Sequence, residues 1–432
     1  MNKNNFLKLL IGLALLAVVP NTLKAQSDDS ILILDELLEK ISTQNPALQA
    51  SYSNWKASET RVSQEKALPD PVIGLGLMNL PLNSFSFDQE PMTGKQLSFM
   101  QPFPYPGKLQ LKADIAKTET EISYNQYLEL ENQLIKKGKQ TYYDLFYIDQ
   151  AISTVLKNQE LVKEFVNITE TRYGVGRGLQ QDVLRAQVEL SKLIDRELKL
   201  LQNRESLQAI INALVNEPAD KPLGKPIVSM SSDLSVQLDA MVQQADSTNP
   251  MLEAWKNAIE RGEKQIDLAK KNRYPDFSFG IAYTQRDPLQ NGMSGYDFVS
   301  AMVNVKVPLY RKQKQDQKVI QTQLGLTAVE QRYQNIENSI EQSIQQTITE
   351  IQKNQRLLDL YETGIIPQAE ESLESSLIGY QNDKVSFLSL LDSELSLFNF
   401  QLDYYRFLAD YHKATAELES LLGSDLQLLS NN

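Results

Sequence analysis

Two segments of the chain decide its architecture, because they are similar to each other and lie far apart. Tyr173–Leu190 reads YGVGRGLQQDVLRAQVEL, and Tyr380–Leu397 reads YQNDKVSFLSLLDSELSL. Each begins with a tyrosine and a short run of turn residues, and each continues into a stretch that favours helix. The two segments are 207 residues apart.

Three further matches occur in the same order and at nearly the same spacing, 204 to 206 residues. They pair Asn45-Pro46-Ala47-Leu48 with Asn249-Pro250-Met251-Leu252, Leu68-Pro69-Asp70-Pro71 with Tyr274-Pro275-Asp276-Phe277, and Pro104-Tyr105-Pro106-Gly107-Lys108 with Pro308-Leu309-Tyr310-Arg311-Lys312. Four ordered matches indicate a duplication. We therefore predict two structural repeats, residues 26–215 and 234–432, joined by a proline-containing linker at residues 216–233.

Composition excludes several classes of protein. The chain has 432 residues, no cysteine and a single histidine, His412, which argues against disulfides, thiolate metal sites and imidazole catalysis. The net charge of −12 argues against nucleic-acid binding. We find no nucleophile–base pair or carboxylate pair, so we expect no catalytic residues, no cofactor, no metal site and no enzyme activity.

The N-terminus is typical of a secretory signal. Lys3 and Lys8 precede the apolar run Leu9–Val19, and we predict cleavage between Ala25 and Gln26. The run is about 11 residues, shorter than the ~20 that span a bilayer as a helix. We expect residues 1–25 to be removed.

Each repeat is predicted to contain a helix, two strands, a long helix, a tight turn and a further helix. In the first repeat the helices are expected at 34–66, with Pro46 interrupting the start, at 108–171 and at 180–214. In the second, they are expected at 315–361 and 385–422, with Gly364 and Pro367 bending the chain between them. Helices of this length, about 95 Å for the longest, need lateral partners as in a coiled coil.

The four predicted strands alternate apolar and small or polar residues with period two. The pattern is clearest after Pro275, where Phe277, Phe279, Ile281 and Tyr283 alternate with small or polar residues. The other strands are expected at 72–80, around 96–99 and at 299–307. Alternation over nine to eleven residues suits a membrane β-barrel, although a soluble sheet shows it too. Four strands cannot close a barrel, so other subunits would have to complete it.

Taken together, these features resemble the TolC family of outer-membrane efflux and secretion channels. The resemblance covers nearly the whole mature chain and is carried by the NP-x-L helix starts, the Pro-Asp strand entries and the glycine-rich turn. It implies a mainly α fold with membrane β-structure, in which a trimer forms a 12-stranded β-barrel on an α-helical barrel. Pro102–Lys108 (PFPYPGK) and Leu68–Leu80 are most similar to the heavy-metal efflux branch.

The resemblance also implies a location, partners and a function. It implies the outer membrane of a Gram-negative bacterium with a periplasmic helical extension, contact with outer-membrane lipid, a periplasmic adaptor protein and an inner-membrane pump. The function would be export of small molecules or metal ions. A duct for type I protein secretion and a secreted helical scaffold are the alternatives.

Two groups of site residues follow from the resemblance. The periplasmic gate would consist of Asp182, Arg185, Tyr380 and Asp392. The tips that contact the adaptor would consist of Tyr173, Gly174, Gly176, Arg177, Gly178, Asp383 and Lys384. Relatives often have glycine in place of Asp383, and some have a second aspartate where this chain has Ser389.

Overall fold

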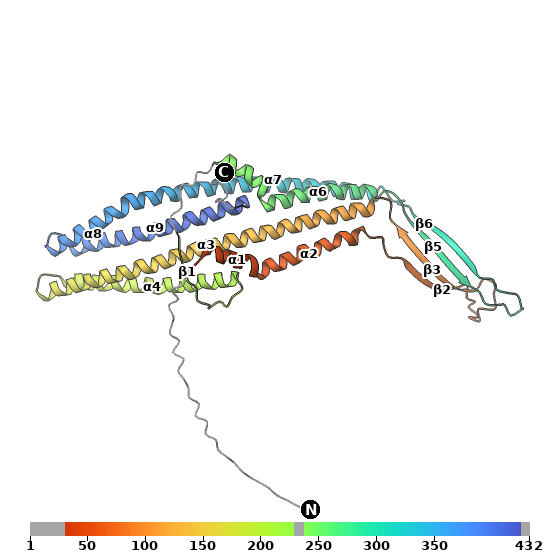
Figure 1. Cartoon of the computed structure of the whole chain (residues 1–432), viewed down its shortest axis with the longest axis horizontal. Helices are drawn as coiled ribbons and strands as arrows, with labels where there is room; N and C mark the ends of the chain where they lie inside the picture. Colours follow the sequence, from red (N-terminus) through yellow and green to blue (C-terminus); the bar gives the residue numbers. More distant parts are fainter. Residues whose placement is uncertain (1–30, 229–236, 425–432) are drawn as a thin grey trace, which may run out of the picture.

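The computed structural model describes residues 31–228 and 237–424, and the predicted signal segment and part of the linker lie outside them. The described chain is elongated, with a bundle of long helices at one end and a four-stranded sheet at the other (Figure 1). None of the helices within the described residues is long and apolar enough to cross a membrane.

The first half contains four helices around one hairpin. Its elements are α1 (Leu34–Gln44), α2 (Pro46–Lys66), β2 (Val72–Met78), β3 (Gly94–Phe103), α3 (Lys108–Gly174) and α4 (Gln180–Leu214). The predicted helices agree with these bounds, and α3 runs for 67 residues. The first strand stops at Met78 instead of Leu80, because Asn79 takes a left-handed backbone (φ 52°).

The second half has the same order of elements. They are α5 (Leu238–Thr248), α6 (Pro250–Lys271), β5 (Asp276–Gln285), β6 (Phe298–Lys306), α7 (Gln315–Leu360), η1 (Tyr361–Ile365), α8 (Ile366–Gln381) and α9 (Phe387–Leu422). The predicted interruption at Gly364 and Pro367 is the π-helical turn η1, since Pro367 has no N–H for the regular helical ladder. α9 begins later than predicted, because Ser386 caps it through the backbone N–H of Ser389.

The Asn-Pro motifs start helices in both halves by the same contacts. The Asn45 side chain accepts hydrogen bonds from the backbone of Ala47 and Leu48 and caps α2, while Asn249 caps α6 through Leu252 N. Each side-chain amide also donates to the end of a distant helix, Asn45 to Leu214 O and Asn249 to Leu421 O, both at 2.9 Å. Proline at the first helical position supplies a suitable φ without losing a bond.

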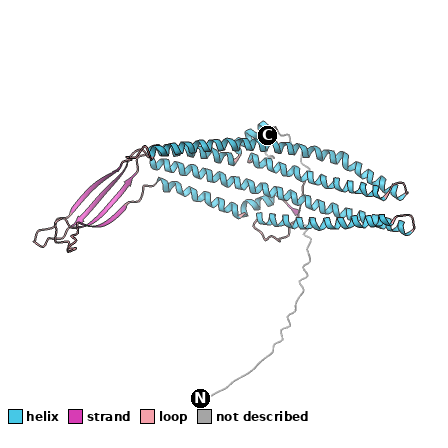
Figure 2. Ribbon diagram, turned by 180° about the vertical axis from the view of Figure 1, so that it is seen from behind, coloured by secondary structure: helices cyan, strands magenta, loops and turns pink. Residues whose placement is uncertain are grey.

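The sheet is antiparallel, in the order β2-β3-β5-β6, so that one hairpin comes from each half (Figure 2). The β3–β5 pair joins the hairpins, with Phe99 opposite Ile281. β2 and β6 are the two edges of this sheet. The predicted linker is not wholly irregular, because its residues Lys225–Pro226 form strand β4, which pairs in parallel with β1 (Ile31–Leu32).

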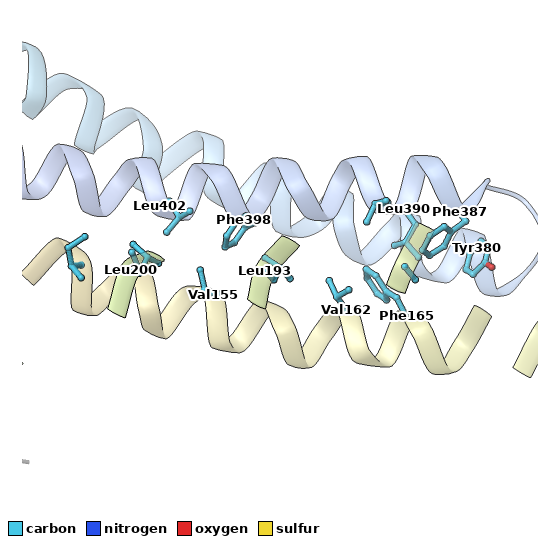
Figure 3. Packing of buried hydrophobic residues seen from close by; sticks show 14 residues of the cluster. Val155, Val162, Phe165, Leu193, Leu200, Tyr380, Phe387, Leu390, Phe398 and Leu402 are labelled. Atoms are coloured by element: carbon cyan, nitrogen blue, oxygen red, sulfur yellow. The ribbon is translucent and has the colours of Figure 1, made fainter. Parts of the chain in front are cut away.

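Apolar side chains hold the helices together along their length. One cluster lies among α3, α4, α8 and α9 in the part of the bundle remote from the sheet, and includes Phe165, Leu193, Phe387 and Leu390 (Figure 3). A second is formed mainly by α5, α6, α7 and α9, and a third by α1, α3 and α4. The bundle therefore has several clusters in succession, as the length of the helices requires.

Candidate functional site

The two helical turns predicted as tips lie at the end of the molecule opposite the sheet (Figure 1). Each closes its helix with the same pair of backbone hydrogen bonds. In the first tip, Arg177 N donates to Arg172 O (2.8 Å) and Gly176 N donates to Tyr173 O (3.0 Å). In the second tip, the equivalent bonds run from Lys384 N to Gly379 O (2.9 Å) and from Asp383 N to Tyr380 O (3.2 Å). These are Schellman caps.

A Schellman cap requires a left-handed residue at one position, and the two tips fill it differently. Gly176 has φ 72° and Asp383 has φ 57°. The left-handed region is open to glycine without steric cost, and aspartate is among the few other residues that enter it. Asp383 thus takes the structural place in the second tip that Gly176 holds in the first.

Arg172 connects the two tips. From the last turn of α3, its Nη1 donates to Tyr380 O (2.8 Å) and Gln381 O (3.2 Å) at the end of α8, and its Nη2 forms an ion pair with the Asp383 carboxylate. Its guanidinium carbon lies 4.7 Å from the centroid of the Tyr380 ring. A cation at these carbonyls satisfies the C-terminal end of α8 and opposes its helix dipole.

Tyr380 is 5% exposed and packs against Phe387, with ring centroids 5.5 Å apart (Figure 3). Burial raises the pKa of Tyr380 and the charge of Asp182 raises it further, while Arg172 lowers it. The Tyr380 hydroxyl has no hydrogen-bond partner among the described residues. Asp182 and Tyr380 are therefore close enough to interact electrostatically, but no hydrogen bond joins them in this chain.

The other predicted gate residues are not brought together. In residues 31–228 and 237–424, Asp182 and Arg185 form no ion pair, although they lie three apart on α4. With the Gln181 amide turned so that its oxygen faces Arg185, that oxygen accepts from Arg185 Nη2 at 2.7 Å. Asp392 is exposed on α9. Our sequence reasoning missed Arg172, whose only signal was a basic residue in the last turn before the glycines.

A buried polar group lies deeper in the helical bundle. Glu394 on α9 is 1% exposed and accepts a hydrogen bond from Asn158 on α3. Burial raises its pKa to about 7, with a further rise from the charge of Glu189 and an opposing effect of Asn158. Glu189 is also buried and pairs with Lys192 Nζ at 2.9 Å. The described residues contain no cluster of three His, Cys, Asp or Glu side chains that could hold a metal ion.

The sheet has one apolar face that no part of the described chain covers. Side chains at odd positions point to it, and Leu75 is 86% exposed there. The exposed set also includes Ile73, Leu77, Leu97, Phe99, Phe279, Ile281, Tyr283, Val299, Val303 and Val305. The opposite face carries small or polar residues such as Gly74, Ser98 and Gly280. A contiguous apolar patch of this kind marks a surface that meets lipid or a partner.

The entry to the sheet is held by an ion pair between the two halves, in which the lysine is buried and the aspartate is partly exposed. Lys108, the first residue of α3, is 6% exposed, and its Nζ lies 2.8 Å from Asp276 Oδ1 at the start of β5. Lys108 Nζ also donates to Tyr274 O (3.3 Å), and Asp276 Oδ1 accepts from Tyr105 N (2.8 Å). The Pro-Asp and PYPGK motifs thus meet at one junction, which fixes where the β3–β5 pair begins.

Comparison with known proteins agrees with this architecture. Residues 241–424 match the family described as outer membrane efflux protein. The chain aligns with the outer membrane protein VceC of Vibrio cholerae at a TM-score of 0.77 and 17% identity, over 91% of this chain and 96% of VceC. It aligns with the CmeC outer membrane channel of Campylobacter jejuni at 0.77 and 13%, over 90% and 85%.

The fold is TolC-like, and the family matched over residues 241–424 is one of outer-membrane transport proteins and not of enzymes. The place of this chain is the outer membrane, with the helical part in the periplasm. The chain is also similar in sequence to the cobalt-zinc-cadmium resistance protein CzcC of Cupriavidus metallidurans. It is 18% identical over 400 residues, which cover 89% of this chain and 91% of CzcC.

Proposed function

We propose that three copies of this chain form a continuous duct, with a 12-stranded β-barrel in the outer membrane above an α-helical barrel. The observation that carries the proposal is the sheet with an uncovered apolar face and two unpaired edges. An open edge in lipid leaves backbone groups unsatisfied at several kcal/mol each, and closure by further copies removes that cost. The small and polar opposite face would then line a water-filled pore.

The test is fractionation followed by sizing in detergent. The protein should partition with outer membranes, and light scattering should find three chains of about 46 kDa each after loss of the signal segment. A matched pair of variants tests which face of the sheet points to the lipid. Leu75→Arg should lower the yield of assembled protein, since an outward charge near the bilayer centre costs about 2–4 kcal/mol. Gly76→Arg should be tolerated better, because its side chain would point to the face that lines the proposed pore, where a charge stays in water. A folded, soluble monomer would overturn the proposal.

The duct would work as the outer part of a tripartite efflux system, with an inner-membrane pump and a periplasmic adaptor. We place the adaptor contact at the tips, residues Tyr173–Gly178 with Asp383 and Lys384. Tyr173, Val175 and Leu179 are at least half exposed there, so the first tip offers apolar contact area. Val175→Glu should abolish cross-linking to the adaptor and export while trimers persist. Export at the parental level would place the adaptor contact elsewhere.

The cargo we favour is metal ions, because CzcC is named for resistance to cobalt, zinc and cadmium. Cells that lack this chain should become sensitive to these metals and retain more of them. Sensitivity to drugs alone, with unchanged metal content, would assign small organic molecules instead.

The gate we propose comprises Asp182, Arg185, Tyr380 and Asp392, with Arg172 added from the structure. Tyr380 would act there through its ring, which packs against Phe387 and Arg172. Copies of these residues would surround the axis at the narrow end of the helical barrel. Carboxylates gathered there would attract cations. Single exposed ion pairs contribute about 0–1 kcal/mol, so several must act together to hold the helices closed.

A further inference from the structure

The pairing of β3 with β5 inside the sheet predicts how the two edge strands, β2 and β6, would pair between copies. Within the chain, the first half contributes β3 and the second half contributes β5, and Lys108 pairs with Asp276 where β3 has ended and β5 begins. β6 is the counterpart of β3 and β2 the counterpart of β5 in the element order of the two halves. In a ring of copies, β6 of one copy would therefore meet β2 of the next as β3 meets β5.

The hairpin registers show that the correspondence holds residue by residue. Asp70 matches Asp276 in the two repeats, and the same offset makes Val72 equivalent to Ser278. Lys108 matches Lys312, and that offset makes Met100 equivalent to Asn304. Val72 lies opposite Met100 in the first hairpin. Ser278 lies opposite Asn304 in the second. The motif matches and the strand pairing thus give the same alignment, although they are independent observations.

We propose that β6 of one copy pairs antiparallel with β2 of the next in the register set by β3 and β5, and that Lys312 pairs with Asp70 at this seam. The inner pair Phe99–Ile281 becomes Val303–Leu75, and the inner pair Ser98–Ala282 becomes Met302–Gly76. The inference rests on the proposed trimer and adds its strand register.

The faces of the sheet agree with this register. It sets Val303 opposite Leu75 and Val305 opposite Ile73, all of them on the exposed apolar face. It sets Met302 opposite Gly76 on the other face. A slip of one residue would turn every apolar side chain of one strand to the pore, so only slips of two residues compete with it.

The charges at the seam agree as well. Asp70 and Lys312 are exposed, and the described residues give neither of them an ion pair. Lys312 lies among turns before α7 begins at Gln315, whereas Lys108 is already in α3. The next copy would supply Lys312 with the carboxylate that Lys108 finds within the chain, and Lys312 should become buried on assembly.

Cysteine pairs test the register, and the chain has no native cysteine to interfere. Met302→Cys with Gly76→Cys should give disulfide-linked dimers and trimers on a non-reducing gel. The slipped pairs, Met302→Cys with Gly74→Cys or Met78→Cys, should link at least about tenfold more slowly, because diagonal neighbours lie ~7–8 Å apart and a disulfide needs Cβ atoms within ~4.5 Å. Ser98→Cys with Ala282→Cys is the matched control and should link within one chain.

The outcomes separate the register from the trimer. If a slipped pair links faster, or if only the control links while the particle still sizes as a trimer, the register is wrong and the proposed function stands. If the particle sizes as a monomer and no pair links between chains, both fail. For the ion pair, Asp70→Lys and Lys312→Asp should each lower the temperature at which the trimer dissociates in dodecyl sulfate, and the double variant should recover it. The control double variant, Asp70→Lys with Lys314→Asp, should keep the lowered dissociation temperature. The ion pair would be overturned if this control recovers the parental temperature, or if Asp70→Lys with Lys312→Asp does not.

Discussion

Arg172 and Asp383 lie 211 residues apart and form an ion pair that joins the tips of the two helical hairpins. The pair explains why an aspartate is tolerated at a left-handed position where glycine would be free of strain. The Asp383 backbone at φ 57° carries a cost of about 1 kcal/mol for a residue with a Cβ. The contact with Arg172 offsets that cost only in part, since Asp383 is 64% exposed and such pairs contribute about 0–1 kcal/mol.

The first prediction concerns this balance. Asp383→Ala should lower the unfolding midpoint, because it keeps the left-handed strain and removes the ion pair. Asp383→Gly should lie about 1 kcal/mol above Asp383→Ala in stability, close to the parent, since it loses the pair and the strain together. Thermal unfolding followed by circular dichroism in detergent measures the order. Equal stability of the two variants would mean that the backbone at residue 383 relaxes.

The second prediction separates Arg172 from Tyr380 at the proposed gate. Arg172→Met should raise the resting conductance of single channels in planar bilayers, because three carbonyl and carboxylate contacts to the neighbouring tip are lost. Arg177→Met is the control, an exposed arginine on the same tip. Tyr380→Phe should leave both stability and conductance nearly unchanged, since the buried hydroxyl has no partner to lose. If Tyr380→Phe opens the channel as Arg172→Met does, the hydroxyl bonds across the trimer.

Much of the fold could be predicted because the duplicated motifs act locally. Asn45 and Asn249 cap helices, Pro46 and Pro250 start them, and the period-two runs form strands, all through contacts within a few residues. The ends of strands and helices were less predictable. Asn79 and Ser386 set two of them through backbone angles and a cap that hydrophobic pattern does not encode.

The candidate site was less predictable than the fold. Spacing on α4 puts Asp182 and Arg185 on one face, but spacing does not say which partner a side chain chooses, and Arg185 lies beside Gln181. Arg172 contacts a helix end more than 200 residues away, a contact that only the packing of α3 against the second half creates. Glu394 is buried for the same reason, because α9 lies against α3 there.

The third prediction concerns the two asparagines that cap α2 and α6, Asn45 and Asn249. Asn45→Ala should destabilise the fold by about 1–2 kcal/mol, because it removes the cap of α2 and leaves Leu214 O without its donor. Asn45→Ser separates the contribution of the helix cap from that of the long-range hydrogen bond, since serine keeps an oxygen for the cap but has no amide to reach Leu214. It should recover roughly half of the loss. Asn249→Ala and Asn249→Ser should repeat the pattern at Leu421. If serine and alanine are equivalent at both sites, the long-range amide bond is the only contributor.

The last prediction is a pH dependence that comes from Glu394. Its pKa in the folded chain is about 7, raised from an ordinary value of 4.5. Between these values the folded chain holds a proton that the unfolded chain has lost, so this group lowers stability as pH rises from about 4.5 to 7, and its effect levels off above that. The total is on the order of 3 kcal/mol per chain.

Glu394→Gln keeps the contact with Asn158 and cannot ionise, so it should raise the unfolding midpoint at pH 8 and change it little at pH 4.5. Glu197→Gln, which alters a carboxylate on α4 that accepts a hydrogen bond from Gln159, is the control and should not remove the slope. Unfolding midpoints of the three proteins between pH 4.5 and 8 decide the matter, and a Glu394→Gln variant with the parental slope would show that Glu394 ionises without cost in the assembled bundle.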